Sequence, residues 1–345
     1  MTKVIARAPG RVNLIGDHTD HTGGLVFPMA IDRDTVVEIE LGPPWLELVS
    51  DDDDEPAVIF FDDPREPSTI QPSWARYVAG VIQALRPEEG GRGFVRSELP
   101  IGAGLSSSAA LEVAVALALG FRGSVRDLAL LCQRAEQMAS GVPCGVMDQL
   151  ASAGGIDGHA LLIDCATLDI TPVPIPSEVD ILVVDSGTRR QLTTSFYGVR
   201  RAQCEEAEAL IGPLRTATLQ DVASIASDDL RHRARHVVSE NDRVRSFAAA
   251  LAADDLSEAG RLMVESHVSL RDDFEVSTRI LDDLVDHLVD QPGVLGARLT
   301  GAGFGGCVVV LADAGTEVDL PAWKVRASAG ASVEVLDDND SEPAE

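Results

Sequence analysis

The sequence predicts a protein of two domains that mix strands and helices, and three observations support this prediction. The chain has 345 residues, which is enough for two hydrophobic cores of ordinary size. Its first hundred residues alternate short β-rich runs with turn signals, whereas residues 194–287 are rich in Ala, Leu, Arg and Glu, which favour helices. A segment with prolines at positions 172, 174 and 176 separates the two patterns and is predicted to be a linker or crossover. We therefore place the domains at residues 1–175 and 176–345.

In the first domain, runs rich in β-branched and aromatic residues predict strands. They are Val4–Ala8, Thr35–Leu41, Trp45–Val49, Val58–Phe61 and Phe94–Leu99. Helices are predicted over Trp74–Leu85, where apolar residues recur at helical spacing, and over Ser107–Gly120 and Ser124–Ser140. Gly141 and Pro143 follow the last of these, and both are typical residues after a helix end.

Strands are also predicted over Ala160–Asp164, Ile181–Asp185, Gly296–Leu299 and Cys307–Leu311. The last two are joined by GAGFGG at Gly301–Gly306, which matches the GxGxxG pattern of dinucleotide-binding proteins. That pattern requires a helix after the glycines, whereas the sequence here continues as CVVVL, which predicts a strand. We therefore predict a tight turn close to a ligand or to the other Gly-rich loop, and the dinucleotide-binding alternative is disfavoured.

Composition excludes several classes of function. The formal net charge of −28 argues against nucleic acid or an anionic membrane surface as a partner. The start of the chain, MTKVIARAPGR, lacks the apolar core of a signal peptide, and the most apolar stretch, Ala109–Phe121, is too short to cross a bilayer. The five cysteines are scattered without a CxxC pair, which indicates neither a disulfide framework nor a zinc ribbon. We expect a cytoplasmic protein that is a monomer or a weak homo-oligomer.

Much of the negative charge lies in two runs. The run DDDDE at Asp51–Glu55 is predicted to be a solvated loop, and DDNDSEPAE at residues 337–345 is predicted to be a frayed acidic tail. Only two of the 28 basic residues are lysines. An acidic protein of this kind can still bind a phosphate if Mg²⁺ and local dipoles supply the positive field.

The stretch GRVNLIGDHTDHTGG at Gly10–Gly24 is dense in polar side chains, and three interpretations compete for it. A zinc site is weakly supported, because His18 and His21 have no thiol nearby and no HExxH pattern is present. A polar loop without chemistry is the second interpretation. The third, a pocket for a hydroxyl-rich ligand, fits best, because carboxylates and imidazole both accept hydrogen bonds from hydroxyl groups.

A second polar segment, LPIGAGLSSSAALE at Leu99–Glu112, places Gly102, Gly104 and three consecutive serines at the start of a predicted helix. Helix N-termini carry unpaired N–H groups and a partial positive charge, which suit a phosphate, and a serine hydroxyl suits Mg²⁺. The alternative is an ordinary Gly-rich turn with a serine cap. The segment is neither a P-loop, since it has no lysine, nor a nucleophile elbow, since G-x-S-x-G does not occur.

Two acids flank a predicted helix end in AEQMASGVPCGVMDQL. Glu136 lies near the end of the helix, and Asp148 lies just after the turn, among apolar neighbours. An acid in such a place is either a structural residue or a catalytic group, and the residues alone leave both interpretations open.

Taken in order, GRVNLIGDHTDHTGG, LPIGAGLSSSAALE and LTGAGFGGC resemble the three motifs of the GHMP small-molecule kinases. The resemblance is closest to the galactokinase family, which CQRAEQMASGVPCGVMDQ, TTSFYGVRRAQCEEAEAL, SHVSLRDDFEVS and WARYVAGVIQAL also resemble. It implies an α+β fold with a ribosomal S5 domain 2-like amino-terminal domain and a ferredoxin-like carboxy-terminal domain. The active site is then expected between the two.

This resemblance also implies an activity, the transfer of the ATP γ-phosphate to the anomeric hydroxyl of α-D-galactose with the help of Mg²⁺. Asp148 corresponds to the catalytic base and Arg11 to the group that stabilises the transferring phosphoryl, while Ser108 and Glu136 correspond to Mg²⁺ ligands. The implied nucleotide contacts are Gly102, Ala103, Gly104, Leu105, Ser106, Ser107, Ser108 and, for adenine, Trp74. The implied sugar contacts are Asp17, His18, Thr19, Asp20 and Tyr197.

The sequence departs from the family pattern in the sugar segment. Galactokinases usually read GEHTDYN where this chain reads GDHTDHT, with Asp17, His21 and Thr22 at the changed positions. A GHMP kinase for a different sugar is therefore one alternative. A non-catalytic sensor of galactose and ATP is another, although Ser106–Ala110 shows no deletion after the serine run, which disfavours it.

Overall fold

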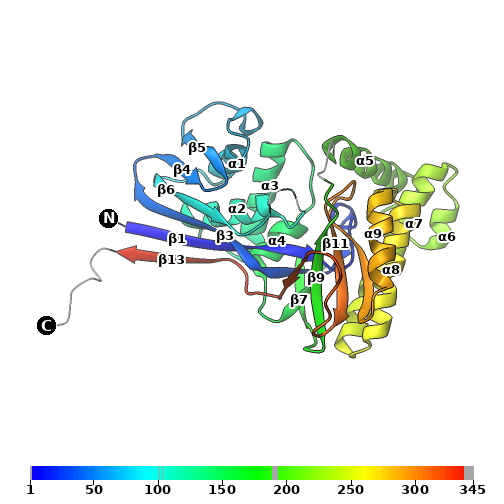
Figure 1. Cartoon of the computed structure of the whole chain (residues 1–345). Coiled ribbons are helices and arrows are strands. Elements are labelled where there is room, and N and C mark those ends of the chain that lie inside the picture. The colour runs from blue at the N-terminus through cyan, green and yellow to red at the C-terminus, as the bar shows by residue number, and fades with distance from the viewer. Residues whose placement is uncertain (1, 101, 103, 189–192, 338–345) are drawn as a thin grey trace.

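Within the described residues, six strands from distant parts of the chain form the largest sheet. The computed structural model describes residues 2–100, 102, 104–188 and 193–337 (Figure 1). The strand order is β13-β1-β3-β6-β4-β5, and neighbours are antiparallel except β4 and β6. The strands are β1 (Thr2–Asn13), β3 (Pro28–Gly42), β4 (Trp45–Ser50), β5 (Asp53–Phe60), β6 (Gly90–Ser97) and β13 (Ser332–Asp337). The five strands predicted in this region are confirmed.

Four helices lie over this sheet (Figure 1). They are α1 (Ala75–Leu85), α2 (Ser107–Ala118), α3 (Val125–Ser140) and α4 (Met147–Gly154). Helix α2 is central, since it contacts β1 and β3 as well as the other three helices, and it is therefore apolar on nearly every side. Helix α3 begins with a capping box formed by Ser124 and Asp127 and ends at Gly141, whose φ of +71° is left-handed. The helix predictions are confirmed to within two residues at each end.

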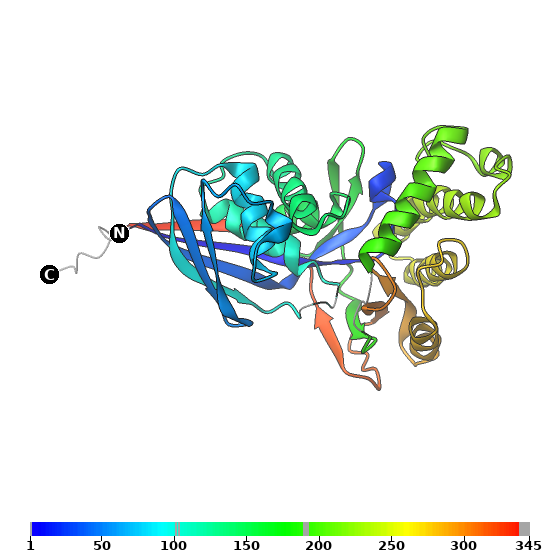
Figure 2. The same cartoon turned by 90° about the horizontal axis from the view of Figure 1, so that it is seen from above.

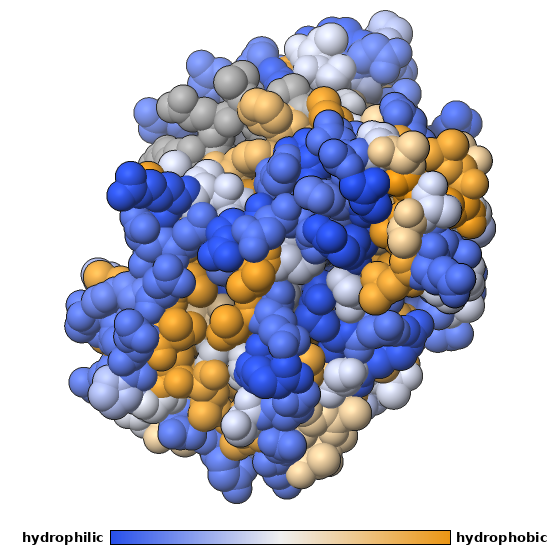
Figure 3. Space-filling model, turned by 90° about the vertical axis from the view of Figure 1, so that its right-hand side faces the viewer, coloured by the Kyte–Doolittle hydropathy of each residue, from blue (hydrophilic) through white to orange (hydrophobic). Residues whose placement is uncertain are grey.

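The second lobe is built on a four-stranded antiparallel sheet of order β10-β11-β9-β12. Its strands are β9 (Val179–Asp185), β10 (Val294–Thr300), β11 (Cys307–Asp313) and β12 (Ala322–Val325). Its helices are α5 (Thr193–Ile211), α6 (Leu219–Ala223), α7 (Asp228–Ala252), α8 (Leu256–Asp272) and α9 (Arg279–Val289). Helices α8 and α9 pack against the sheet, and α7 packs against α8 and α5. Seen from the side of this lobe, the surface is mostly hydrophilic, with hydrophobic patches between the polar groups (Figure 3).

The proline-rich segment, predicted to be a linker or crossover, is partly a strand, and after Pro174 the chain crosses to β9 in the second lobe. A small sheet of β2 (Leu25–Val26), β7 (His159–Asp164) and β8 (Asp169–Pro174) takes up most of that segment. Pro172 and Pro174 lie in β8, which pairs with β7 along its whole length. An edge strand tolerates proline because its outward N–H groups need no partner, and β8 is such an edge strand.

The end of the chain returns to the first lobe. Strands β12 and β13 follow β11 and were not predicted; the reddish strands in Figure 2 show that β12 lies in the second lobe while β13 runs beside β1. Asp337, predicted to begin a frayed tail, is the last residue of β13, and residues 338–345 lie outside the described part of the chain. The division into residues 1–175 and 176–345 stays a prediction.

The acidic run Asp51–Glu55 is only partly the loop that was predicted. Asp51 and Asp52 form a turn, but Asp53–Glu55 begin β5 and extend the β4–β5 hairpin. Their side chains stay largely exposed, so the charges are solvated even though the backbone is paired. Pairing is therefore compatible with charge here because β5 is an edge strand.

Candidate active site

A cavity of about 700 Å³ lies where the two lobes meet. Its wall combines the segment after β1, the start of α2, the end of α3 and the start of α4 with residues from the second lobe. The second lobe contributes Tyr197 from α5 and Gly301 and Ala302 from the turn between β10 and β11. The predicted turn at Gly301–Gly306 is confirmed, and β11 directly follows it, which excludes the dinucleotide-binding interpretation.

Arg11 and Asp148 form an ion pair on the cavity wall. The Nε and Nη2 atoms of Arg11 lie 2.8 and 2.7 Å from Oδ1 of Asp148, and Nη1 donates to the Gly104 carbonyl at 2.6 Å. The Ser106 hydroxyl donates to the other oxygen of Asp148 at 2.5 Å. Arg11 comes from β1 and is only 5% exposed, and Asp148 lies in the first turn of α4. One guanidinium and one hydroxyl thus fix the orientation of the carboxylate, and the link from Ser106 was not predicted.

The Gly-rich loop before α2 has a left-handed backbone at its glycines, as glycine allows. Gly102 and Gly104 have φ of +79° and +83°, and Ser106, the residue before the helix, is also left-handed at +59°. Both glycines line the cavity, as do the three serines Ser106, Ser107 and Ser108. Leu105 does not line it, because its side chain is buried in the hydrophobic core. Ala103 lies outside the described residues.

Ser108 and Glu136 meet on the same wall. The Ser108 hydroxyl donates to Glu136 Oε1 at 2.9 Å, and the Gln149 amide donates to Oε2 at 2.6 Å. Desolvation, and next the charge of Asp148, raise the pKa of Glu136 to about 7. Gln149 also reaches the fully buried Glu112 at 3.3 Å, whose pKa burial raises well above its usual value. Gln149 and Glu112 were not predicted as site residues, although both stand in the quoted motifs.

Asp17 lines the cavity, but both of its carboxylate oxygens already have partners in the second lobe. Oδ1 accepts from the Gly301 N–H at 2.9 Å, and Oδ2 lies 2.6 Å from Nη2 of Arg298 in β10. Both side chains are buried. Burial raises the pKa of Asp17, and the two arginines Arg298 and Arg11 oppose this rise. Asp17 therefore links the segment after β1 to the second lobe.

His18 is held in a conformation that few residues adopt. Its φ is +65°, and its ring centroid lies 4.5 Å from that of Phe274 and 5.6 Å from that of Tyr197, with the rings tilted in both pairs. Neither ring nitrogen makes a hydrogen bond within the part of the chain that the structure describes. Burial lowers the pKa of His18 well below its usual value, so the ring that lines the cavity is neutral and carries one donor and one acceptor nitrogen.

Asp20 and Tyr197 face the same region of the cavity. Burial, and next the charge of Asp148, raise the pKa of Asp20 to about 6, and burial also raises the pKa of Tyr197. A Cβ atom added to Gly145 would lie 1.7 Å from Oδ2 of Asp20, so the close approach of this carboxylate requires glycine there. Thr19 does not line the cavity, because its hydroxyl donates to the backbone carbonyls of Gly16 and Leu25.

Trp74 lies directly before α1 and lines the cavity as predicted. Its indole Nε1–H donates to the Glu55 carbonyl at 3.3 Å.

His21 does not line this cavity, and burial lowers its pKa to about 3. Within the described residues, no group of three or more His, Cys, Asp and Glu side chains is arranged to hold a metal, which leaves the zinc interpretation without support. In the same residues no helix combines the length and apolar character of a membrane span.

Family models match most of the chain. A galactokinase galactose-binding signature matches residues 1–41, a GHMP kinase N-terminal domain matches residues 76–155, and a GHMP kinase C-terminal domain matches residues 247–320. The first of these contains Arg11 and the residues from Asp17 to Asp20. The second contains the Gly-rich loop, Glu136 and Asp148.

Known proteins resemble the chain over nearly its full length. A galactokinase of Chloroflexus aurantiacus is 47% identical over 329 residues, which cover 89% of this chain and 83% of that protein. The galactokinase of Homo sapiens is 45% identical over 328 residues, again 89% of this chain and 83% of the relative. The crystal structure of Lactococcus lactis galactokinase complexed with galactose aligns with a TM-score of 0.87 at 31% identity, covering 96% of this chain and 95% of that one.

Proposed function

The chain belongs to the galactokinase family of the GHMP kinases and phosphorylates galactose with ATP, and we propose that Asp148 and Arg11 carry out the transfer. The observation that supports these roles is the ion pair between them on the wall of the cavity, next to the Gly-rich loop. The comparisons favour galactose over a different sugar, and a kinase over a non-catalytic sensor.

In this proposal Asp148 is the general base. It removes the proton from the anomeric hydroxyl of galactose while the oxygen forms a bond to the γ-phosphorus, and the bond from that phosphorus to the β-phosphate oxygen breaks to release ADP. The guanidinium of Arg11 holds the Asp148 carboxylate in place through the ion pair, and its planar donors suit the charge that develops on the transferring phosphoryl. The Ser106 hydroxyl keeps the second oxygen of the carboxylate in a fixed direction.

ATP is proposed to bind with its phosphates at the Gly-rich loop and its adenine at Trp74. The N-terminus of α2 offers unpaired N–H groups at Ser107 and Ser108, and the left-handed backbone at Gly102 and Gly104 lets the loop approach the phosphates. Ala103 and Leu105 were also predicted to contact ATP as part of this loop. The side chain of Leu105 packs in the hydrophobic core and so fixes the loop to the first lobe. The loop thus holds a triphosphate without a lysine.

Mg²⁺ is proposed to bind at Ser108 and Glu136. The donor set fits, because a hydroxyl and a carboxylate oxygen 2.9 Å apart are hard ligands on the cavity wall, and Mg²⁺ usually takes one or two protein ligands and fills its shell with phosphate and water. Desolvation, and next the charge of Asp148, raise the pKa of Glu136, and a bound cation would oppose both effects. When bound, the ion neutralises phosphate charge.

Galactose is proposed to contact His18, Asp20 and Tyr197. These side chains line one region of the cavity and present hydrogen-bonding groups of both kinds. Asp17 lines the cavity as well, with its charge balanced by Arg298, and Thr19 shapes the loop through backbone contacts. We further place the enzyme in the cytoplasm, as a monomer or weak homo-oligomer, on the basis of its sequence.

A panel of sugars tests the proposed substrate. ADP release is measured with galactose, its C2, C4 and C6 variants, and mevalonate as an unrelated GHMP-type acceptor. We expect turnover with galactose to exceed that with every other acceptor. No turnover with galactose, together with turnover on another sugar, would overturn the assignment. Galactose binding without any ADP release would instead indicate a sensor.

A further inference from the structure

The segment SHVSLRDDFEVS at Ser266–Ser277 lies outside the cavity wall, and the proposed mechanism does not use it. It forms the end of α8 and the loop that follows. Its side chains nevertheless reach toward the residues proposed to bind galactose. We call residues 16–25, which contain those residues from the first lobe, the sugar loop.

Three side chains on one face of α7 hold the sugar loop by its backbone. The Gly16 N–H donates to Glu240 at 3.0 Å, the Leu25 N–H donates to Asn241 at 2.7 Å, and the Asp17 carbonyl lies 3.1 Å from Nε2 of His236. His236, Glu240 and Asn241 are all buried, and their spacing places them on the same side of the helix. The loop therefore depends on a helix more than 200 residues later in the chain.

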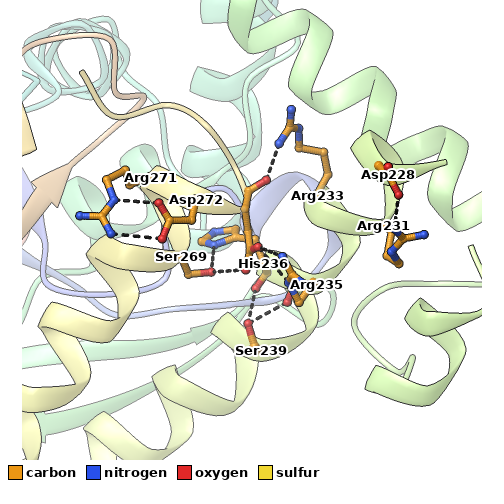
Figure 4. A network of polar contacts seen from close by, with 10 residues as sticks. Asp228, Arg231, Arg233, Arg235, His236, Ser239, Ser269, Arg271 and Asp272 are labelled. Carbon is orange, nitrogen blue, oxygen red and sulfur yellow. Dashed lines mark hydrogen bonds and ion pairs between the residues drawn. The ribbon is translucent and has the colours of Figure 1, made fainter. Parts of the chain in front are cut away.

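Helix α8 in turn orients the side chains of α7. The Ser266 hydroxyl donates to Glu240 at 2.5 Å, and the Ser269 hydroxyl lies 2.9 Å from Nδ1 of His236, a contact that Figure 4 shows. Burial lowers the pKa of His236 to about 4, so the ring is neutral near pH 7. A backbone carbonyl only accepts, so Nε2 must carry the proton toward Asp17, and Nδ1 accepts from Ser269.

A column of rings connects the same residues to the cavity. Phe274, which is fully buried, lies with its ring centroid 4.5 Å from that of His18 and 4.8 Å from that of His236. The Phe274 carbonyl accepts from Nε of Arg200 at 2.7 Å, one helical turn after Tyr197 on α5. Phe274 thus contacts one proposed sugar residue with its ring and the helix of another with its backbone.

We propose that His236 and Phe274 are positioning residues for galactose, which hold His18 and the sugar loop in the geometry that binds the sugar. This inference rests on the proposed function. The left-handed backbone of His18 is unfavourable for a residue with a side chain, and such conformations persist only where the surroundings enforce them. The hydrogen bond to the Asp17 carbonyl and the ring of Phe274 are two of the second-lobe contacts that enforce it.

The test compares galactose binding with ATP binding in His236→Phe, His236→Gln and Phe274→Leu. The first keeps a ring against Phe274 but removes the hydrogen bond, so we expect the galactose KM to rise about three- to tenfold, with the ATP KM within about twofold. Phe274→Leu removes the ring contact and should raise the galactose KM to a similar degree. His236→Gln places an amide donor near the position of Nε2 and should restore the galactose KM to within about twofold of the wild type.

His267→Gln is the matched control. His267 is also a buried histidine with a pKa lowered to about 4, but its ring contacts Asp282 and the Leu299 N–H and does not touch the sugar loop. A role limited to stability predicts that both histidine variants lower the unfolding midpoint while leaving the galactose KM unchanged. Equal galactose KM values for His236→Phe and the wild type would overturn the inference.

Two further measurements keep the outcomes distinct. If His236→Phe does not fold, Ser269→Ala removes only the hydroxyl on Nδ1 and should raise the galactose KM about threefold, and an unchanged value contradicts the inference. Calorimetric titration of the wild type and the variants with galactose distinguishes failure of the proposed function from failure of the positioning role. Absence of binding by the wild type overturns the proposed function, whereas normal binding by both the wild type and the variants overturns only the positioning role.

Discussion

The two sides of the cavity are built in different ways. On the phosphate side, all the proposed residues come from the first lobe, where Asp148 contacts Arg11 and Ser106, and Ser108 contacts Glu136. On the sugar side, the loop at residues 16–25 depends on α7, β10 and the loop after α8 for its conformation. The phosphate side is therefore built within one lobe, while the sugar side is built from contacts between both lobes. The following substitutions test this difference, beginning with the largest expected effect.

Asp148→Asn should abolish most phosphorylation without disturbing the lobes. The amide keeps the size of the carboxylate but cannot accept the sugar proton, so kcat should fall by about 10²–10⁴ while the affinity for ATP stays within a few-fold. Stopped assays of galactose phosphate and a separate nucleotide titration provide the two values. A variant with near-normal kcat would remove Asp148 from the role of base.

Glu136→Gln should affect the metal requirement of the phosphate side alone. Losing a carboxylate ligand is expected to raise the Mg²⁺ concentration for half-maximal activity by about 10–100-fold, which is the range found even for residues behind the ligands. Galactose affinity measured without nucleotide should be unchanged, because the sugar loop is held from the other lobe. A matching loss of galactose affinity would show that the two sides are not independent.

The sequence predicts the phosphate side of the cavity better than the sugar side, because the phosphate side is built from local motifs and the sugar side from contacts between distant segments. Arg11, the glycine loop and Asp148 stand in short motifs whose composition indicates their chemistry, and the strands and helices that carry them are periodic and well bounded. The ion pair between Asp17 and Arg298 joins residues 281 positions apart, and no local pattern indicates it. The same holds for β13, whose pairing with β1 is decided by a free sheet edge rather than by its own six residues.

Gly145→Ala tests the sugar side from within the first lobe. The added Cβ would overlap Oδ2 of Asp20, so Asp20 must move, and we expect the galactose KM to rise about tenfold while the ATP KM changes less than twofold. Gly198→Ala is the matched control. Gly198 directly follows Tyr197 in the chain, but a Cβ atom added to it would meet no atom within 4 Å. An unchanged galactose KM in Gly145→Ala would mean that Asp20 does not contact the sugar.

The smallest expected effect is on the pH dependence of stability, where the two sides act in opposite directions. The pKa of His236 is about 4 in the native state against 6.5 when unfolded. As pH falls from 6.5 to 4 the unfolded chain takes up a proton that the native chain does not, so the free energy of unfolding decreases. The pKa of Glu136 is about 7 in the native state against 4.5 when unfolded. Between pH 4.5 and 7 only the unfolded chain releases this proton, so the free energy of unfolding decreases as pH rises.

Each group contributes a slope of at most about 1.4 kcal/mol per pH unit, so the two largely cancel in the wild type between pH 4.5 and 6.5. Removing one should expose the other. Glu136→Gln should become less stable on acidification relative to the wild type, and His236→Phe should become relatively more stable there, as measured by urea unfolding at pH 5, 6 and 7. Parallel pH profiles for both variants and the wild type would contradict the assignment, since neither group would then differ between the native and unfolded states.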